Sequence, residues 1–217
     1  MKQDIKICLP LYKLVYSVMF LIILSLVRGI STVFEIGGAL DSNIALLAIV
    51  FCAETYVMEK SGGRGEIFRL FPVKNRVKAV RRRLLIQNLY LYLLSYIGFF
   101  FFFWQRPQNM IGISFWYEYG TYMLAVTGTI LFWSTLSMTI SNLFGNQWGG
   151  IAVSLIIWMV VNSMYGQDVL GKFNIFAYGF RNVMEVHDVS WLFGKLAGAL
   201  SAMLMIGLIP YIMKKRG

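Results

Sequence analysis

The segment RRRLLIQNLYLYLLSYIGFFFFFW, residues 81–104, decides how this chain can fold. Three arginines are followed by a run that carries no charged side chain and that ends in six aromatic residues. A helix needs about 20 mainly apolar residues to cross the hydrocarbon core of a bilayer. We therefore predict a membrane-spanning helix that begins after Arg83 and ends near Trp104.

The composition of the whole chain agrees with a membrane protein. Of its 217 residues, 58% are hydrophobic and 14% are charged, and the mean hydropathy is +0.65. Soluble domains carry roughly 25% charged residues, and a soluble domain of this size lacks the interior volume to bury so much apolar surface. Disorder is excluded as well, because a chain this apolar collapses or enters lipid. We expect a single transmembrane domain over residues 1–217.

Five further segments have the length and apolar character of spanning helices, so we predict an all-α integral membrane protein with six transmembrane helices. The first segment is interpreted as a retained anchor, since Arg28 follows it and no small-residue cleavage site does. The last segment contains Pro210 near its end. The five segments are residues 14–27 (extendable to 34), 42–58, 119–141, 148–165 and 191–213.

The basic residues predict the orientation of these helices. There are 20 Lys and Arg against 10 Asp and Glu, and fifteen of the basic residues cluster at 2–13, 60–83 and 214–216. With six spans, all three clusters fall on one side, as expected for the cytoplasmic side. We therefore predict cytoplasmic N- and C-termini, a cytoplasmic loop at 59–83 and an external loop at 166–190. Because the clusters adjoin apolar spans, we attribute them to topology and expect no nucleic-acid partner.

The sequence offers few groups for catalysis or cofactor binding. It contains no HExxH, no GxSxG, no paired Cys/His spacing and no phosphate-binding GxxxxGKS or GxxxxGKT loop. The single histidine, His187, lies in the external loop, and Cys8 and Cys52 are interpreted as ordinary thiols. We expect no enzyme activity, no catalytic residue, no metal site and no cofactor in this chain.

Glu54 is the one ionisable residue that lies clearly inside a predicted span. Charged groups within a membrane are costly, so they are candidates for function. Two interpretations stay open: Glu54 is hydrated or paired with a loop arginine at the cytoplasmic boundary, or it belongs to a transport pathway. An ion-driven carrier usually shows buried carboxylates nearer the middle of the membrane, and their scarcity argues against such a carrier.

Within the cytoplasmic loop, a short segment has the pattern of an amphipathic helix. Its four apolar residues fall on one helical face, its glutamate and arginine project from the other, and a proline ends it. A helix this short is unstable alone in water, so it needs the bilayer surface or the groove of a partner protein. The segment comprises Glu66, Ile67, Phe68, Arg69, Leu70, Phe71 and Pro72.

The order Glu54, Glu59 and then GEIFRLFPVKNR at 65–76, followed by a basic helix into the third span, resembles the first cytoplasmic loop of ABC-2-type transporter permeases. The resemblance covers sequence over residues 52–86 and six-span topology over the whole chain. It implies half of a membrane channel that pairs with a second copy or a sister permease. It also implies two separate ATP-binding-cassette (ABC) ATPase subunits that bind ATP and Mg²⁺ and receive residues 66–72 in a cleft. A short helical element at 173–186 would match the family's element between spans five and six.

The resulting hypothesis is a permease subunit in a bacterial plasma membrane, crossing it several times and exporting amphipathic cargo such as a lipid, peptide or drug. Asn162 and Ser163 in span five, together with Glu54, are the candidate pathway or gating residues. The alternative is a substrate-binding six-span subunit of an energy-coupling-factor-type importer. That alternative expects a small-residue stripe in span one, whereas residues 11–29 are bulky throughout. A membrane-bound enzyme comes third.

Overall fold

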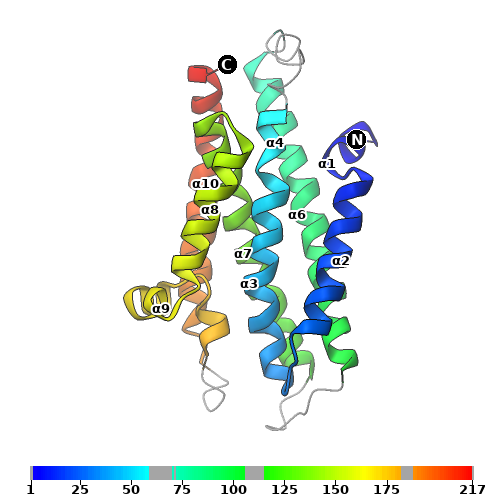
Figure 1. Ribbon diagram of the computed structural model, residues 1–217. Coiled ribbons are helices and arrows are strands. Elements are labelled where there is room, and N and C mark those ends of the chain that lie inside the picture. Colours follow the sequence, from blue (N-terminus) through cyan, green and yellow to red (C-terminus); the bar gives the residue numbers. More distant parts are fainter. Residues whose placement is uncertain (1, 59–69, 71, 106–114, 182–187, 217) are drawn as a thin grey trace.

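A computed structural model describes residues 2–58, 70, 72–105, 115–181 and 188–216 of the chain. The long helices of this described part form one elongated bundle, and a short helix (α9) projects from its side (Figure 1). Its long members are α3 (Val33–Cys52), α6 (Val73–Trp104), α7 (Phe115–Phe144) and α10 (Trp191–Arg216). Both chain termini lie at the same end of the bundle, which we call the terminal end (Figure 1).

In the described residues, four helical segments are long and apolar enough to cross a membrane: Val33–Val57, Val73–Trp104, Phe115–Phe144 and Trp191–Lys214. The first joins α3 to the short α4 (Glu54–Val57). A fifth crossing is formed if α8 (Gln147–Val161) and α9 (Met164–Leu170) count as one span, although the chain bends there by 74°. The apolar helix α2 (Leu11–Val27) has 17 residues, about 26 Å of helix. The count of six spans therefore remains a prediction.

The helix α3 is the most enclosed of these elements, and small residues allow its close packing. Ser137 on α7 donates a hydrogen bond of 2.7 Å to the carbonyl oxygen of Ile49 on α3. Gly38 and Gly179 bring α3 into backbone contact with the short helix η3 (Ala177–Phe180), because a Cβ on Gly38 would lie 3.0 Å from the Cα of Gly179. Small residues at helix contacts let backbones approach closely, which is the usual basis of packing between membrane helices.

The connection between α7 and α8 is specified by local backbone chemistry. Gly145 has a φ of +68°, a left-handed conformation that glycine adopts without a steric penalty. The side chain of Asn146 then accepts a hydrogen bond of 3.0 Å from the backbone N–H of Trp148, which caps the start of α8. Next to this turn the two helices touch closely: a Cβ on Gly150 would lie 1.8 Å from the Oγ of Ser141.

Several helix boundaries differ from the sequence prediction. The helix α3 begins at Val33, nine residues before the predicted start at 42, so Asp41 lies inside the helix. Likewise α7 begins at Phe115, which places Glu118 in its first turn. The predicted end near Trp104 is confirmed for α6, and this helix begins directly after Pro72, within the basic segment.

The predicted loop elements are only partly described. Of the amphipathic segment 66–72, the structure describes Leu70, which is helical and 83% exposed, and Pro72, which precedes α6. Glu66, Ile67, Phe68, Arg69 and Phe71 lie outside the described residues. In place of one helix over 173–186, the described part of that region contains the short turns η2 (Gly171–Phe173) and η3.

Candidate functional site

Three helices meet at a buried polar cluster formed by Asp41, Thr129 and Lys195. The Nζ of Lys195 on α10 lies 2.5 Å from Oδ2 of Asp41 on α3, and the two side chains are 5% and 1% exposed. The hydroxyl of Thr129 on α7 donates a bond of 2.6 Å to Oδ1 of Asp41 and accepts one from Lys195. Both charges are therefore paired and hydrogen-bonded, which is the condition under which a buried ion pair is tolerated.

Gly128 provides the space that brings Lys195 to this cluster. A Cβ on Gly128 would lie 3.2 Å from the Cβ of Lys195 and 3.4 Å from its backbone oxygen, so α7 and α10 are close at this level. The aliphatic stem of Lys195 packs against α7 at Gly128, and its ammonium group contacts Asp41 on α3. The cluster thus joins α3, α7 and α10 at one level of the bundle.

A second buried pair lies nearer the end of the bundle that is opposite the termini. The Nη2 of Arg181, which follows η3, is 3.5 Å from Oε2 of Glu118 on α7, and both side chains are almost fully buried. The guanidinium lies over the rings of Tyr178 and Phe34, at 3.8 and 4.6 Å from their centroids. Among the described residues, its Nη1 and the Oε1 of Glu118 are buried without a hydrogen-bond partner, so within this part of the chain the pair retains unused donor and acceptor capacity.

One residue of each pair, Asp41 and Arg181, lines a cavity of about 500 Å³, which we call the polar cavity. Its lining includes two basic residues, Arg28 and Arg181, and two acidic residues, Glu35 and Asp41. The volume falls within the range of roughly 300–1,000 Å³ that is usual for ligand sites. Charges of both signs give the cavity the chemistry to hold an anionic group at the arginines and a hydrogen-bond donor or cation at the carboxylates.

The predicted pathway residues fall at different places. Asn162 lies at the break between α8 and α9 and lines the polar cavity. The hydroxyl of Ser163 is used within the same turn, donating to Val160 O at 2.6 Å and accepting from Gly166 N at 3.1 Å. Ser163 therefore caps α9, and the structure brings only Asn162 of the two to the cavity.

Glu54 lies toward the other end of α3, thirteen residues from Asp41, or about 20 Å along a helix. Its Oε1 is 2.5 Å from the Nζ of Lys13, which also donates a bond of 3.0 Å to Phe51 O. Lys13 is buried and its Nζ lies 5.1 Å from the ring centroid of Phe51. The structure pairs Glu54 with a base of α2 in place of the expected loop arginine, and a place for Glu54 in a transport pathway stays a prediction.

The expectation that Glu54 is the one clear ionisable residue inside a span is wrong. The side chains of Asp41 and Lys195 are less exposed than that of Glu54. Glu118, in the first turn of α7, is also buried. The sequence carries a signal for Asp41, because residues 36–40 directly before it are uncharged and continue the span toward its N-terminus. Nothing local in the sequence pairs Asp41 with Lys195, which lies 154 residues later.

In the residues that the structure describes, no three His, Cys, Asp or Glu side chains gather as a metal site would require. Comparisons of the chain with protein-family models, with curated proteins and with solved structures find no match.

Proposed function

We propose that this chain is the membrane-spanning permease subunit of an ABC transporter, exporting amphipathic cargo with energy from separate ATPase subunits. In this proposal α2 and the bent pair α8–α9 complete six spans, and both termini face the cytoplasm of a bacterial cell. Two permease subunits, identical or related, enclose the pathway. ATP and Mg²⁺ bind to the partner ATPases.

The observation that carries the proposal is the continuity of α6. This helix has 32 residues and starts immediately after Pro72, where the segment that resembles a coupling loop ends. At about 1.5 Å per residue it is about 48 Å long, and the hydrocarbon core is about 30 Å thick. Roughly 18 Å of rigid helix therefore extends beyond the core on the side of residues 66–72. A displacement of that segment would be transmitted directly into the membrane.

Ion pairs at the terminal end of the bundle support such transmission. Asp4 on α1 (Lys2–Cys8) lies 2.6 Å from Arg82 and 3.6 Å from Arg83, in the basic part of α6. The pair of Lys13 and Glu54 joins α2 to α4, which continues α3, at the same end of the bundle. Movement of α6 would therefore carry α1 with it, and Lys13 and Glu54 would keep α2 and α3 together.

The test co-expresses the chain with a candidate ABC ATPase and purifies the two together. Leu70→Asp and Phe68→Asp are expected to reduce co-purification of the ATPase at least tenfold, because each places a carboxylate on the predicted apolar docking face. Leu70 is 83% exposed, so its replacement leaves the described fold unchanged. Asn75→Asp is the matched control, since it adds the same charge at an exposed position of α6. Unchanged co-purification of both variants would contradict the proposal.

The polar cavity favours a second candidate, the substrate-binding subunit of an energy-coupling-factor-type importer. A single chain supplies this cavity and places charges of both signs around it, as capture of a small polar molecule requires. Native mass spectrometry of the purified chain would then detect a retained small molecule. Arg181→Met is expected to abolish retention, whereas Lys172→Met, an exposed lysine in η2 that does not line the cavity, retains it. A chain that carries no such molecule excludes this candidate.

A further inference from the structure

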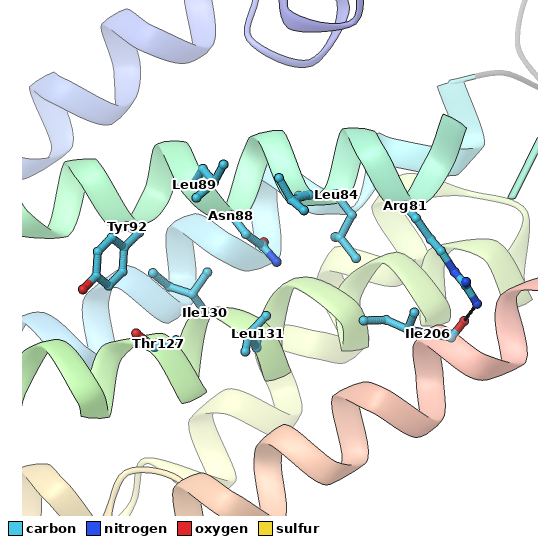
Figure 2. Close-up of a pocket in the computed structure, with 10 residues that line it drawn as sticks. Arg81, Leu84, Asn88, Leu89, Tyr92, Thr127, Ile130, Leu131 and Ile206 are labelled. Atoms are coloured by element: carbon cyan, nitrogen blue, oxygen red, sulfur yellow. Dashed lines mark hydrogen bonds between the residues drawn. The ribbon is translucent and has the colours of Figure 1, made fainter. Parts of the chain in front are cut away.

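A second cavity, distinct from the polar cavity, lies between α6, α7 and α10 and has a volume of about 600 Å³ (Figure 2). We call it the apolar groove. Its walls are formed mainly by aliphatic side chains, with Arg81 at one end and Tyr92 at the other (Figure 2). Arg81 and Tyr92 are eleven positions apart, which corresponds to about 16 Å of helix. One leaflet of the hydrocarbon core is about 15 Å deep, half of the total of about 30 Å. The groove thus has the length of an acyl chain in one leaflet.

The position of Arg81 along α6 places it at the depth of lipid headgroups. Residues 84–104 carry no charge and form a length of helix that matches the hydrocarbon core of about 30 Å. Arg81 lies one turn before this run. An acyl chain in the groove would therefore have its phosphate beside the guanidinium of Arg81.

The surface above the groove is basic. Lys74, Lys78 and Arg81 are exposed and spaced by four and three residues, so they share one side of α6. Among the residues that the structure describes, none of the three pairs with a carboxylate, since Asp4 pairs with Arg82 and Arg83 instead. Within the described part of the chain, this side of α6 therefore presents positive charge without a carboxylate partner where a phosphate would lie.

A proline fixes the orientation of Arg81. Pro210 on α10 has no N–H, so the carbonyl of Ile206 lacks its usual helical donor four residues later. The Nη2 of Arg81 donates to that carbonyl at 3.2 Å (Figure 2). A guanidinium has five N–H donors, so one bond to Ile206 holds the group at the mouth of the groove and leaves other donors for an anionic oxygen.

We propose that the apolar groove binds one anionic phospholipid from the leaflet at the terminal end of the bundle. One acyl chain lies along Leu85 and Leu89, and the phosphate is held by Arg81 with Lys78 beside it. The net negative charge of the headgroup is required, because a zwitterionic lipid brings its own cation to the three basic side chains. This proposal concerns binding to the isolated chain and does not depend on an ATPase.

The test is a titration of the purified full-length chain with phosphatidylglycerol or phosphatidylcholine of identical acyl chains, followed by native mass spectrometry. The first phosphatidylglycerol is expected to bind at least about tenfold more tightly than phosphatidylcholine, since each basic residue near a lipid surface favours anionic lipid by on the order of fivefold. Arg81→Gln is expected to reduce the affinity for phosphatidylglycerol on the order of fivefold, and Arg81→Lys is expected to restore most of it.

Two controls make the result specific. Arg28→Gln removes an exposed arginine that lines the polar cavity and should leave lipid binding unchanged. Leu131→Trp fills the groove and should weaken binding of both lipids. Equal affinities of the two lipids for the wild-type chain overturn the proposal, as does an equal loss in Arg28→Gln and Arg81→Gln. Dimerisation that lipid displaces and that is lost in Leu131→Trp also overturns the proposal, because the groove then binds a second copy of the chain.

Discussion

Removing one partner of the pair formed by Asp41 and Lys195 should destabilise the bundle far more than removing both. In Asp41→Asn the ammonium group of Lys195 stays buried but loses its counter-charge. In Lys195→Met the carboxylate of Asp41 stays buried and loses its counter-charge. The side chains are 1% and 5% exposed, so water screens neither charge. The double variant carries no charge at either of these two positions, and the asparagine that replaces Asp41 can still form a hydrogen bond with Thr129.

The distance between the charges sets the magnitude. At 2.5 Å and an effective dielectric constant of about 20, the attraction is about 7 kcal/mol. Much of this offsets the cost of removing both groups from water, so the pair contributes little relative to a neutral replacement. Breaking a buried pair on one side costs about 3–5 kcal/mol. For a chain of this size that corresponds to a fall in the unfolding temperature of about 6–20 °C, at about 2–4 °C per kcal/mol.

The assay is thermal unfolding of the detergent-purified protein, followed by the fluorescence of its six tryptophans. Each single variant is expected to unfold at a temperature lower by the stated amount. The double variant should lose no more stability than either single variant, which gives a coupling energy of about 3 kcal/mol or more. If the two single losses simply add in the double variant, Asp41 and Lys195 do not stabilise the bundle as a pair.

Two other predictions follow from local packing and from burial. Gly150→Ala should destabilise the protein by about 1–3 kcal/mol, because its Cβ would lie 1.8 Å from the Oγ of Ser141. Gly149→Ala is the matched control, because its Cβ would lie 3.6 Å from Phe144 and alanine favours a helix by about 1 kcal/mol. Thermal unfolding separates the two, and equal effects would show that the contact of α7 with α8 is looser than described. Burial raises the pKa of the Cys8 thiol from 9.0 to about 11, so its thiolate fraction at pH 8 is about 100-fold below that of an unperturbed thiol. In a variant without Cys52, maleimide labelling should therefore keep rising tenfold per pH unit above pH 9, and a plateau near pH 9 would contradict the raised pKa.

The long apolar helices are the part of the fold that the sequence predicts well. Residues 84–104 form a helix whatever packs around them, because an uncharged run of this length is most stable when its backbone is hydrogen-bonded within the segment. The predicted end at Trp104 is accordingly found in α6. Hydropathy is a property of each segment alone, so it needs no knowledge of the rest of the chain.

Helix starts that contain acidic residues were predicted less well, for a physical reason. Asp41 and Glu118 each reduce the apolar character of their surroundings, so the predicted spans began just after them at 42 and 119. Both residues lie inside helices because basic side chains far along the chain, Lys195 and Arg181, compensate their charge. This charge compensation depends on tertiary structure, so the hydropathy of a short stretch of sequence does not reveal it.

The candidate site shows the same division. Asn162 was selected for being a polar residue in an apolar run, and it does line the polar cavity. Ser163 was selected on the same grounds, yet its hydroxyl serves the local turn that begins α9. Polar character alone does not distinguish the two, because the difference lies in the break of the helix between α8 and α9.

The separation of Asp41 and Lys195 along the chain also has a consequence for biosynthesis. The two residues are 154 positions apart, and ribosomes add roughly 5–20 residues per second. The carboxylate on α3 therefore exists for about 8–30 s before its lysine has been made. During that interval α3 is held by the insertion machinery, by water or by a proton on Asp41. Any nascent chain that stops short of α10 carries this acid without its partner, which gives quality-control proteases a physical mark of an unfinished protein.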